Sequence, residues 1–337
     1  MSEESMIFCG FDDGHRETKA VFSNGTRLII PSRAMSGLST RIAINGSQNS
    51  VISYNTSEGH FSMGDVEDAE DTAYDEYPFS AQNRVIATHA LRLANLKENQ
   101  QLGVVSGLPL KRFYLKGSPN KDVIGKKKAN LMKHDVVGLD GYLPPKIIKH
   151  DVMAEAIAAW VNYIMQRRDG GKLYIDKVRV SRRTAIIDIG GRTLDIAVVK
   201  DWEMDGARST SDEIGMITII EAMRERLYDI FNGVEPTDEM VEQAVITGEV
   251  RAWGKITSVK EIREEVIMGV VNSLKATIKR RLRSSQDIDS VFFIGGTAKF
   301  LERYLKDWFP NQVDVEDPVF ANAEGMLKYA EYVMGKK

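Results

Sequence analysis

Residues 186–195, Ile-Ile-Asp-Ile-Gly-Gly-Arg-Thr-Leu-Asp, decide how this chain is expected to fold. An apolar run ends at Asp188, two glycines follow, and Asp195 opens a second apolar run, which predicts a strand, a tight turn and a second strand. Glycines in such a turn let backbone N–H groups approach a phosphate closely. An ordinary structural turn is the alternative interpretation of this loop taken alone.

Residues 11–19, Phe-Asp-Asp-Gly-His-Arg-Glu-Thr-Lys, repeat the same plan near the start of the chain. A predicted strand runs into Asp12 and Gly14, and Lys19 adds a positive charge. Asp12 suits a hydrated Mg²⁺, because this ion keeps several waters and takes few carboxylates. A solvent-facing Asp-Gly hairpin is the commoner meaning of one such loop. Two loops at matching positions of two halves favour a triphosphate held from both sides. Neither loop has the Gly-x-x-x-x-Gly-Lys-[Ser/Thr] pattern of a Walker loop.

Two further stretches carry candidate chemistry. The apolar run that ends at Ile294 leads into Gly295 and Gly296, where a ribose or a flat ring can lie on the backbone. Close packing of a strand on a helix is an equal interpretation of these glycines. We expect Glu155 early in a helix that follows a strand, where its carboxylate would polarise the water that attacks a terminal phosphate. A carboxylate in a first helical turn is also favoured by the helix dipole alone.

Strands alternate with helices along the rest of the sequence, which predicts an α/β fold. The predicted helices cover residues 81–96, 154–166, 216–230, 237–247, 258–283, 299–308 and 321–334. Residues 31–80 predict a small variable subdomain, whose acidic stretch 65–76 is expected to be solvated. The glycine pair at 170–171 suggests a boundary between two halves. We therefore expect lobe I to comprise residues 1–172 plus 320–337, and lobe II residues 173–319.

Composition narrows the function classes. The chain has 337 residues, 45 Lys and Arg against 48 Asp and Glu, a net charge of -3 and one cysteine. This charge argues against a protein that coats nucleic acid. One cysteine excludes an internal disulfide and a multi-thiolate metal site. The apolar runs are too short for a membrane helix, and residues 1–6 do not form a signal segment. We expect a cytoplasmic protein that binds neither nucleic acid nor membrane directly.

The two aspartate–glycine loops and the Ile294-Gly-Gly turn occur in the order used by the actin, heat-shock chaperone and sugar kinase ATPases. Within that superfamily the sequence resembles the plasmid-segregation actins called ParM or StbA, from residue 6 to about 330. The segments that carry this resemblance are 11–14, 108–110, 127–130, 152–155, 186–195 and 294–296. The resemblance implies the actin-like ATPase fold, with two ribonuclease-H-like lobes and a nucleotide in the cleft between them.

The resemblance also implies roles for single residues. Glu155 and Asp188 would be catalytic, and Asp12 and Asp188 would hold Mg²⁺ through water. The residues implied to bind the nucleotide are Asp12, Asp13, Gly14, Lys19, Gly190, Gly191, Arg192, Thr193, Arg224, Glu225, Gly295 and Gly296. Surface charge on an amphipathic helix is the alternative for Arg224 and Glu225, and a solvated basic face is the alternative to a nucleotide contact for Lys128.

His15, Arg16 and Arg192 depart from the small residues usual in the family, which leaves the choice between ATP and GTP open. The resemblance implies a bacterial, cytoplasmic ATPase that uses Mg²⁺, polymerises with itself and segregates plasmid DNA through a DNA-bound ParR-like adaptor, with hydrolysis triggering disassembly. The alternatives are a sugar or acetate-type kinase, which needs an Asp base that does not stand out here, a cell-shape or division actin, and a chaperone ATPase domain.

Overall fold

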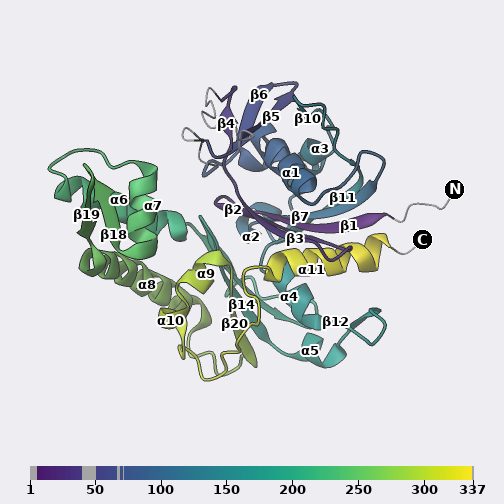
Figure 1. The fold of residues 1–337 in the computed structure, drawn as a ribbon. Coiled ribbons are helices and arrows are strands. Elements are labelled where there is room, and N and C mark those ends of the chain that lie inside the picture. Colours follow the sequence, from purple (N-terminus) through teal and green to yellow (C-terminus); the bar gives the residue numbers. More distant parts are fainter. Residues whose placement is uncertain (1–5, 40–50, 67–68, 71, 336–337) are drawn as a thin grey trace.

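The computed structural model describes residues 6–39, 51–66, 69–70 and 72–335 of the chain. Figure 1 shows two lobes, each built on a sheet with helices beside it. In the first lobe a five-stranded sheet has the order β11-β7-β1-β2-β3. Its strands are β1 (Ile7–Asp13), β2 (Glu17–Phe22), β3 (Arg27–Pro31), β7 (Gln101–Leu108) and β11 (Lys146–Ala154).

The second lobe repeats this plan. Its sheet has the order β16-β15-β14-β20, with β17 paired to β15. The strands are β14 (Thr184–Ile189), β15 (Leu194–Lys200), β16 (Glu203–Met204), β17 (Thr210–Asp212) and β20 (Ser290–Ile294). β1 forms a hairpin with β2 and pairs in parallel with β7, and β14 likewise forms a hairpin with β15 and pairs in parallel with β20. Two equivalent turns, β1–β2 and β14–β15, therefore arise from two equivalent sheets.

Two helices pack together between these sheets, α4 (Ile157–Ile164) and α11 (Ala321–Tyr329), and a π-helical segment (Ala330–Met334) follows α11. A methyl group on Gly325 of α11 would lie 1.7 Å from the carbonyl oxygen of Ala158 in α4. A methyl group on Gly10 of β1 would lie 1.9 Å from the carbonyl oxygen of Ala323. Glycine at both positions lets the backbones of α4, α11 and β1 come into contact.

A small subdomain covers one end of the first sheet. Its own sheet has the order β10-β5-β6-β4, formed by β4 (Met35–Ser36), β5 (Val51–Thr56), β6 (Gly59–Gly64) and β10 (Val137–Gly138). Buried Tyr54, Phe61 and Met63 join it to the core of the first lobe. A 3-10 turn (Tyr77–Phe79), α1 (Ala81–Leu93) and α3 (Lys121–Leu131) pack nearby. Residues 67, 68 and 71 of the acidic stretch, and residues 40–50, lie outside the described residues.

A helical block extends the second lobe outward. It contains α6 (Met216–Ile230), α7 (Asp238–Thr247), the hairpin of β18 (Glu249–Ala252) and β19 (Lys255–Ser258), and α8 (Lys260–Leu282). Val241, Ile267, Leu274 and other buried aliphatic residues fill its core. The shorter elements are α2 (Leu110–Phe113), β8 (Tyr114–Leu115), β9 (Ser118–Pro119), β12 (Met165–Arg167), β13 (Leu173–Ile175), α5 (Lys177–Ser181), α9 (Gly296–Phe300) and α10 (Glu302–Leu305).

Two predicted helices differ from the structure in where they begin or in how they divide. The helix expected from residue 154 begins at Ile157, because β11 continues to Ala154 and residues 155–156 form a turn in which Ala156 has a φ of 62°. The single helix expected over 299–308 is two short helices. The glycine pair at 170–171 lies in the turn of the β12–β13 hairpin. Within the described ranges, every helix is too short or too polar to cross a bilayer.

Candidate functional site

The two hairpin turns face one another across a shared cleft. Asp12 is paired in register with Lys19 at the end of β1, and Asp188 with Asp195 at the end of β14. A methyl group on Gly191 would lie 2.8 Å from Cβ of Arg16, so the turns are in contact. Twelve of the predicted residues line this cleft: Asp12, Asp13, Gly14, Lys19, Glu155, Asp188, Gly190, Gly191, Arg192, Thr193, Gly295 and Gly296. Residues almost 300 positions apart thus form one site.

Hydrogen bonds from α6 and α9 fix the β14–β15 turn. The carbonyl oxygen of Gly190 accepts hydrogen bonds from the Thr297 hydroxyl at 2.7 Å and from the backbone N–H of Met216 at 3.3 Å. The carbonyl oxygen of Gly191 accepts one from the backbone N–H of Ile217 at 2.9 Å. The donors of these three bonds lie in the first turns of α6 and α9. A turn whose carbonyl groups point back into the lobe is suited to present its N–H groups to a phosphate.

Gly295 lies at the point where β20 meets α9. Its φ is 97°, and a methyl group there would lie 2.5 Å from Oδ1 of Asp188 and 2.5 Å from the carbonyl oxygen of Ile189. Both the positive φ and the close approach require glycine. The chain can therefore turn directly beside the Asp188 carboxylate.

A buried ion pair fixes the first turn. The Lys127 ammonium of α3 lies 2.8 Å from both carboxylate oxygens of Asp13, and the Asn83 side-chain amide donates to the same carboxylate at 2.7 Å. Lys127 is 1% exposed. The neighbouring Lys128 instead pairs with Asp151 at 2.7 Å on the outside. Of these two adjacent lysines, Lys127 lines the cleft, whereas Lys128 is partly exposed outside it, which fits a solvated basic face.

Asn322, at the start of α11, links the two lobes through the site. Its side-chain N–H donates to Oδ2 of Asp188 at 2.6 Å. Its side-chain oxygen, Oδ1, accepts a hydrogen bond from the backbone N–H of Ala156 at 3.1 Å. This second bond holds the turn that carries Glu155. Gly107 of β7 leaves room for that side chain, since a methyl group there would lie 3.0 Å from Oε1 of Glu155. Sequence reasoning missed Asn322, because a single Asn in a helix gives no local signal.

The cleft holds an excess of buried acidic groups. Burial, followed by the nearby carboxylates of Asp12 and Asp195, raises the pKa of Asp188 to about 8. Burial also raises the pKa of Asp12 to about 6, against the opposing effect of the Lys19 ammonium. Burial raises the pKa of Asp195 to about 6, and burial together with these three aspartates raises the pKa of Glu155 well above its usual value. Such an assembly is short of positive charge.

A bound cation would relieve this repulsion. Among the described residues, no cluster of three or more His, Cys, Asp and Glu is arranged to hold a metal directly. Mg²⁺ does not need such a cluster, because it binds through one or two carboxylates and its own waters. The oxygen donors of Asp12 and Asp188, together with their raised pKa values, therefore fit a hydrated Mg²⁺.

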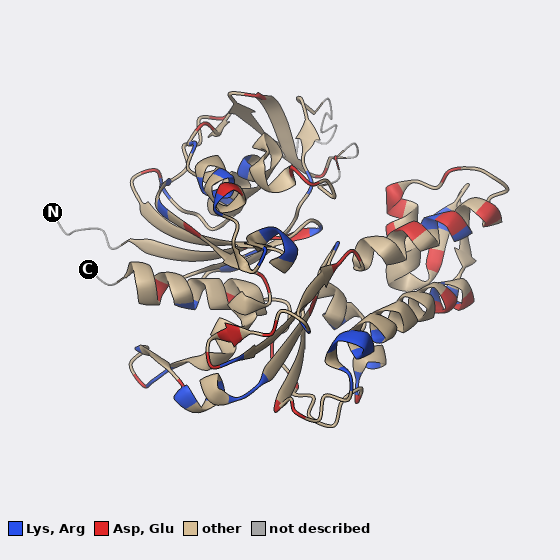
Figure 2. Ribbon diagram, turned by 180° about the vertical axis from the view of Figure 1, so that it is seen from behind, with Lys and Arg blue, Asp and Glu red and all other residues tan. Residues whose placement is uncertain are grey.

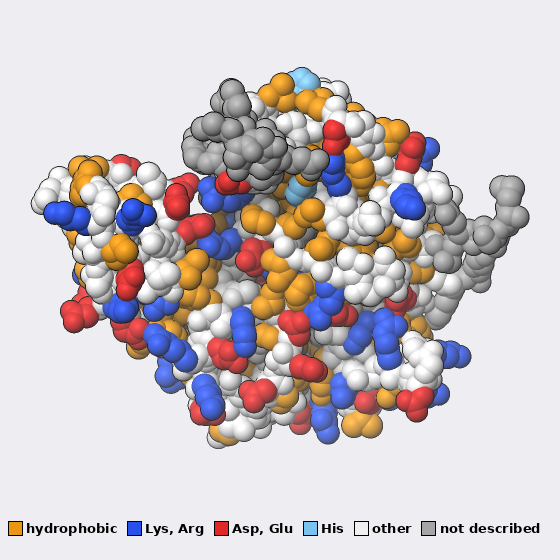
Figure 3. Space-filling view, in the orientation of Figure 1, with side chains coloured by type: hydrophobic (Ala, Val, Ile, Leu, Met, Phe, Trp, Pro, Cys, Tyr) orange, Lys and Arg blue, Asp and Glu red, His pale blue; other side chains and the backbone are white. Residues whose placement is uncertain are grey.

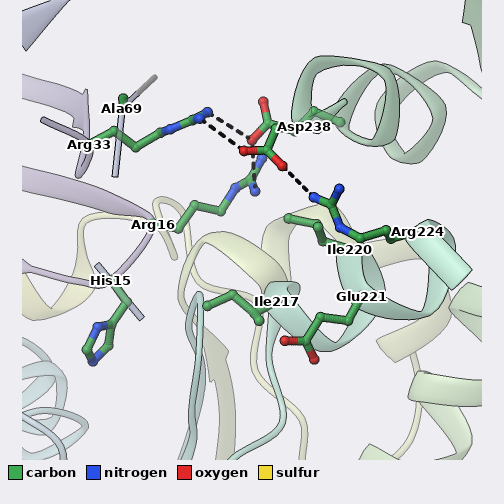
Figure 4. A pocket seen from close by; sticks show the side chains of 10 residues that line it. His15, Arg16, Arg33, Ala69, Ile217, Ile220, Glu221, Arg224 and Asp238 are labelled. Carbon is green, nitrogen blue, oxygen red and sulfur yellow. Dashed lines mark hydrogen bonds and ion pairs between the residues drawn. The ribbon is translucent and has the colours of Figure 1, made fainter. Parts of the chain in front are cut away.

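Arg224 and Glu225 are not among the residues that line this cleft. Arg224 pairs with Asp238 at 2.5 Å and lines a second cavity with His15, Arg16 and Arg33, shown in Figure 4. Glu225 is exposed on α6. Their predicted place beside the base or ribose therefore stays a prediction, with charge on an amphipathic helix as its alternative.

Arg192 reaches from the second turn toward the small subdomain. Its guanidinium lies 3.1 Å from Oδ1 of Asp75 and 3.4 Å from Oε1 of Glu213. Asp75 belongs to the acidic stretch that the sequence predicts to be solvated, and its carboxylate is indeed largely exposed. This contact connects the two lobes across the edge of the cleft.

Two lobes of the same plan, whose hairpin turns meet in one cleft, define the actin-like ATPase fold, which the comparisons confirm. Residues 7–165 match the family model of the N-terminal part of plasmid segregation protein ParM, and residues 186–307 match that of the C-terminal part of archaeal MreB-like actin homologues. These matches confirm the resemblance to ParM over residues 7–165, and the chain has the actin-like ATPase fold.

Relatives and solved structures agree with this assignment. The chain is 22% identical over 344 residues to an archaeal actin homologue of Thermoplasma acidophilum, with 98% of this chain and 100% of the relative covered. A 15-stranded ParM filament from Clostridium botulinum has a TM-score of 0.76 at 18% identity, covering 97% of this chain and 99% of that one. An archaeal actin homologue in complex with ADP has a TM-score of 0.73 at 20% identity, covering 97% and 100%.

Proposed function

We propose that this chain hydrolyses ATP in the cleft between its lobes and polymerises into filaments whose growth and disassembly segregate DNA. The observation that carries this proposal is the meeting of the β1–β2 and β14–β15 turns around one buried group of carboxylates. A triphosphate between the turns would accept hydrogen bonds from the backbone N–H groups of Gly14 and residues 191–193, because the Gly190 N–H already donates to the carbonyl oxygen of Thr193 at 2.9 Å. Lys19 would add a positive charge beside them.

The acidic residues of this cleft would have two different roles, which are metal binding and activation of the attacking water. Asp12 and Asp188 would hold Mg²⁺ through its waters, and the ion would supply the positive charge that offsets the phosphates and the carboxylates. Glu155 would orient and polarise the attacking water, because its turn is fixed by Asn322 and its raised pKa favours accepting a proton. Gly295 and Gly296 would lie at the adenosine side.

Hydrolysis would act on filament stability through closure of the cleft. A γ-phosphate and its cation would be held by residues of both turns, and their loss would weaken the link between the lobes. In an open-ended polymer each subunit uses two different surfaces. The resemblance of the fold to subunits of a ParM filament and of an Alp12 filament supports self-assembly. A DNA-bound ParR-like adaptor would attach the filament, so that this chain need not bind DNA itself.

Polymer assembly and nucleotide turnover test the proposal together. Light scattering and sedimentation after addition of ATP and Mg²⁺ should show reversible polymer, and parallel reactions with GTP decide the nucleotide preference. Glu155→Ala should still bind nucleotide and assemble, but its filaments should persist because turnover falls by about 10²-fold or more. Asp188→Ala should abolish Mg²⁺-dependent turnover. A sugar-dependent ATPase rate without polymer would instead support a kinase and reject the filament proposal.

A further inference from the structure

Three arginines converge on two carboxylates beside the mouth of the cleft. Asp238 and Glu242 lie one turn apart on α7, in the second lobe. Arg33, which follows β3 in the first lobe, lies 3.5 Å from Oδ2 of Asp238 and 3.8 Å from Oε1 of Glu242. Arg16, in the β1–β2 turn, lies 3.4 Å from Oε1 of Glu242. Figure 4 shows Arg33 and Arg16 reaching toward Asp238 from one side and Arg224 from the other.

This cluster also forms the wall between two cavities. One cavity is lined by residues of α6 and the first turn, among them Ile217 and Ile220. The other extends under the small subdomain and is lined by residues that include Met63 and Leu93. Arg16, Arg33 and Glu242 line both cavities. If the lobes separated at this point, the two cavities would merge into one opening beside the first turn.

The strength of these contacts suits a reversible link. The Arg16, Arg33 and Glu242 side chains are about one-third exposed and Asp238 is 61% exposed, so each pair is weak and is screened by salt. Figure 2 shows acidic positions gathered on the block that contains α6, α7 and the start of α8, a surface that attracts the two arginines of the opposite lobe. Both pairs of Arg33 must break before the small subdomain can move away from α7, and the Arg16–Glu242 pair must break before the first turn can do so.

We propose that Arg16, Arg33, Asp238 and Glu242 form an electrostatic clasp, which holds the small subdomain against α7 and slows nucleotide release. This inference rests on the proposed nucleotide function. Arg16 joins the clasp directly to the first phosphate turn, two residues after Gly14. Opening of the clasp therefore loosens the turn at the same moment as it opens the path out of the cleft.

Release of a fluorescent ADP analogue tests the clasp. Arg33→Gln removes both cross-lobe pairs of Arg33, and we expect release to become about three- to tenfold faster in low salt. The matched control is Arg226→Gln, because Arg226 pairs with Glu265 at 2.9 Å inside the second lobe and crosses no cleft. Because salt screens these pairs, a higher salt concentration should raise the release rate of the unmodified protein to that of Arg33→Gln. Equal release rates for Arg33→Gln, the control and the unmodified protein would overturn the proposal.

A distance measurement without nucleotide separates this inference from the proposed function. The one cysteine, Cys9, is fully buried, so spin labels can be placed at two introduced sites, His60→Cys in β6 and Thr257→Cys in β19. We expect a longer or broader distance distribution when Arg33→Gln is added, and no change with Arg226→Gln. This change in a chain that binds no nucleotide would support the link between the lobes and reject the nucleotide function. An unchanged distance in a chain that does bind nucleotide would reject the clasp alone.

Discussion

Asp188 lies between the carboxylate of Asp12 and the amide of Asn322, and its pKa is raised to about 8 from an ordinary value of 3.8. A carboxyl whose pKa is higher in the folded than in the unfolded protein makes its full contribution to stability at a pH below the unfolded pKa. That contribution is lost as the pH rises through about 8. We therefore expect the nucleotide-free protein to lose up to a few kcal/mol of stability between about pH 4 and pH 9. Asp188→Asn, followed by urea unfolding across this range, should flatten the decline.

The same titration has the opposite effect on ligand binding. Mg²⁺ requires ionised carboxylates. The fraction of molecules in which Asp12 and Asp188 are both ionised increases as the pH rises from 6 to 8. We expect the affinity for Mg²⁺-ATP, measured by calorimetry, to increase over this interval. Asp188→Asn should weaken binding and remove part of the pH dependence. An affinity that is independent of pH in the unmodified protein would contradict the assignment of Asp188.

Lys127 and Lys128 form a natural comparison, because they are adjacent lysines in very different surroundings. Lys127→Met leaves the buried Asp13 carboxylate without its cation, and breaking such a pair costs about 3–5 kcal/mol. Lys128→Met removes a partly exposed pair with Asp151 and should cost less than about 1 kcal/mol. Chemical denaturation of both variants measures the difference. Equal losses would show that the Asp13 pair does not hold the first turn.

The sequence predicts the two turns well because their signal is local. Asp12, Gly14, Asp188 and Gly190 each follow an apolar strand within a few residues, and backbone geometry then fixes their positions. The bonds of Asn322 span 134 and 166 residues, and the pair between Lys127 and Asp13 spans 114. Contacts of this kind depend on how the elements pack, and no periodicity or turn rule contains that information.

At the scale of elements, α4 and α11 determine how the two sheets meet. Gly325→Ala would place a methyl group 1.7 Å from the carbonyl oxygen of Ala158, so the two helices must move apart. We expect a loss of about 1–3 kcal/mol or more. The control is Gly269→Ala in α8, where the added methyl group meets no atom within 4 Å and should stabilise the helix by about 0.5–1 kcal/mol. Thermal unfolding that shows equal effects would exclude a close contact between α4 and α11.

The turn before α4 shows where prediction from sequence fails at this scale. The residues from 154 onward have a strong helical pattern, yet β11 continues to Ala154 and Glu155 stays outside the helix. The bond from Ala156 to Asn322 in α11 holds this turn, in which Ala156 adopts a positive φ. The helix thus begins later than its propensity suggests, because a tertiary contact overrides a local preference.

At the scale of the whole molecule, the β18–β19 hairpin presents an apolar tip. Trp253 is 75% exposed and Ile256 is 67% exposed. Figure 3 shows hydrophobic side chains at this outer edge of the second lobe. Trp253 also has a φ of 46° in a Trp-Gly turn, where Asn or Asp would be favoured. Among the described residues, Trp253 makes an edge contact with Phe231, and most of its surface is left exposed in a backbone conformation that disfavours Trp. We expect this tip to contact the next subunit of a filament.

Trp253→Asn tests this contact without damage to the hairpin, because Asn-Gly is the preferred pair for such a turn. Stability should change by less than about 1 kcal/mol, since the better turn offsets the lost Phe231 contact. The critical concentration for polymer, measured by sedimentation, should rise at least about tenfold, which corresponds to a loss of about 1.4 kcal/mol at the contact. Lys116→Asn is the control, because Lys116 has a φ of 51° in the equivalent position of the β8–β9 hairpin. Unchanged assembly of Trp253→Asn would place the filament contact on another surface, and the apolar tip would then have no role in self-association.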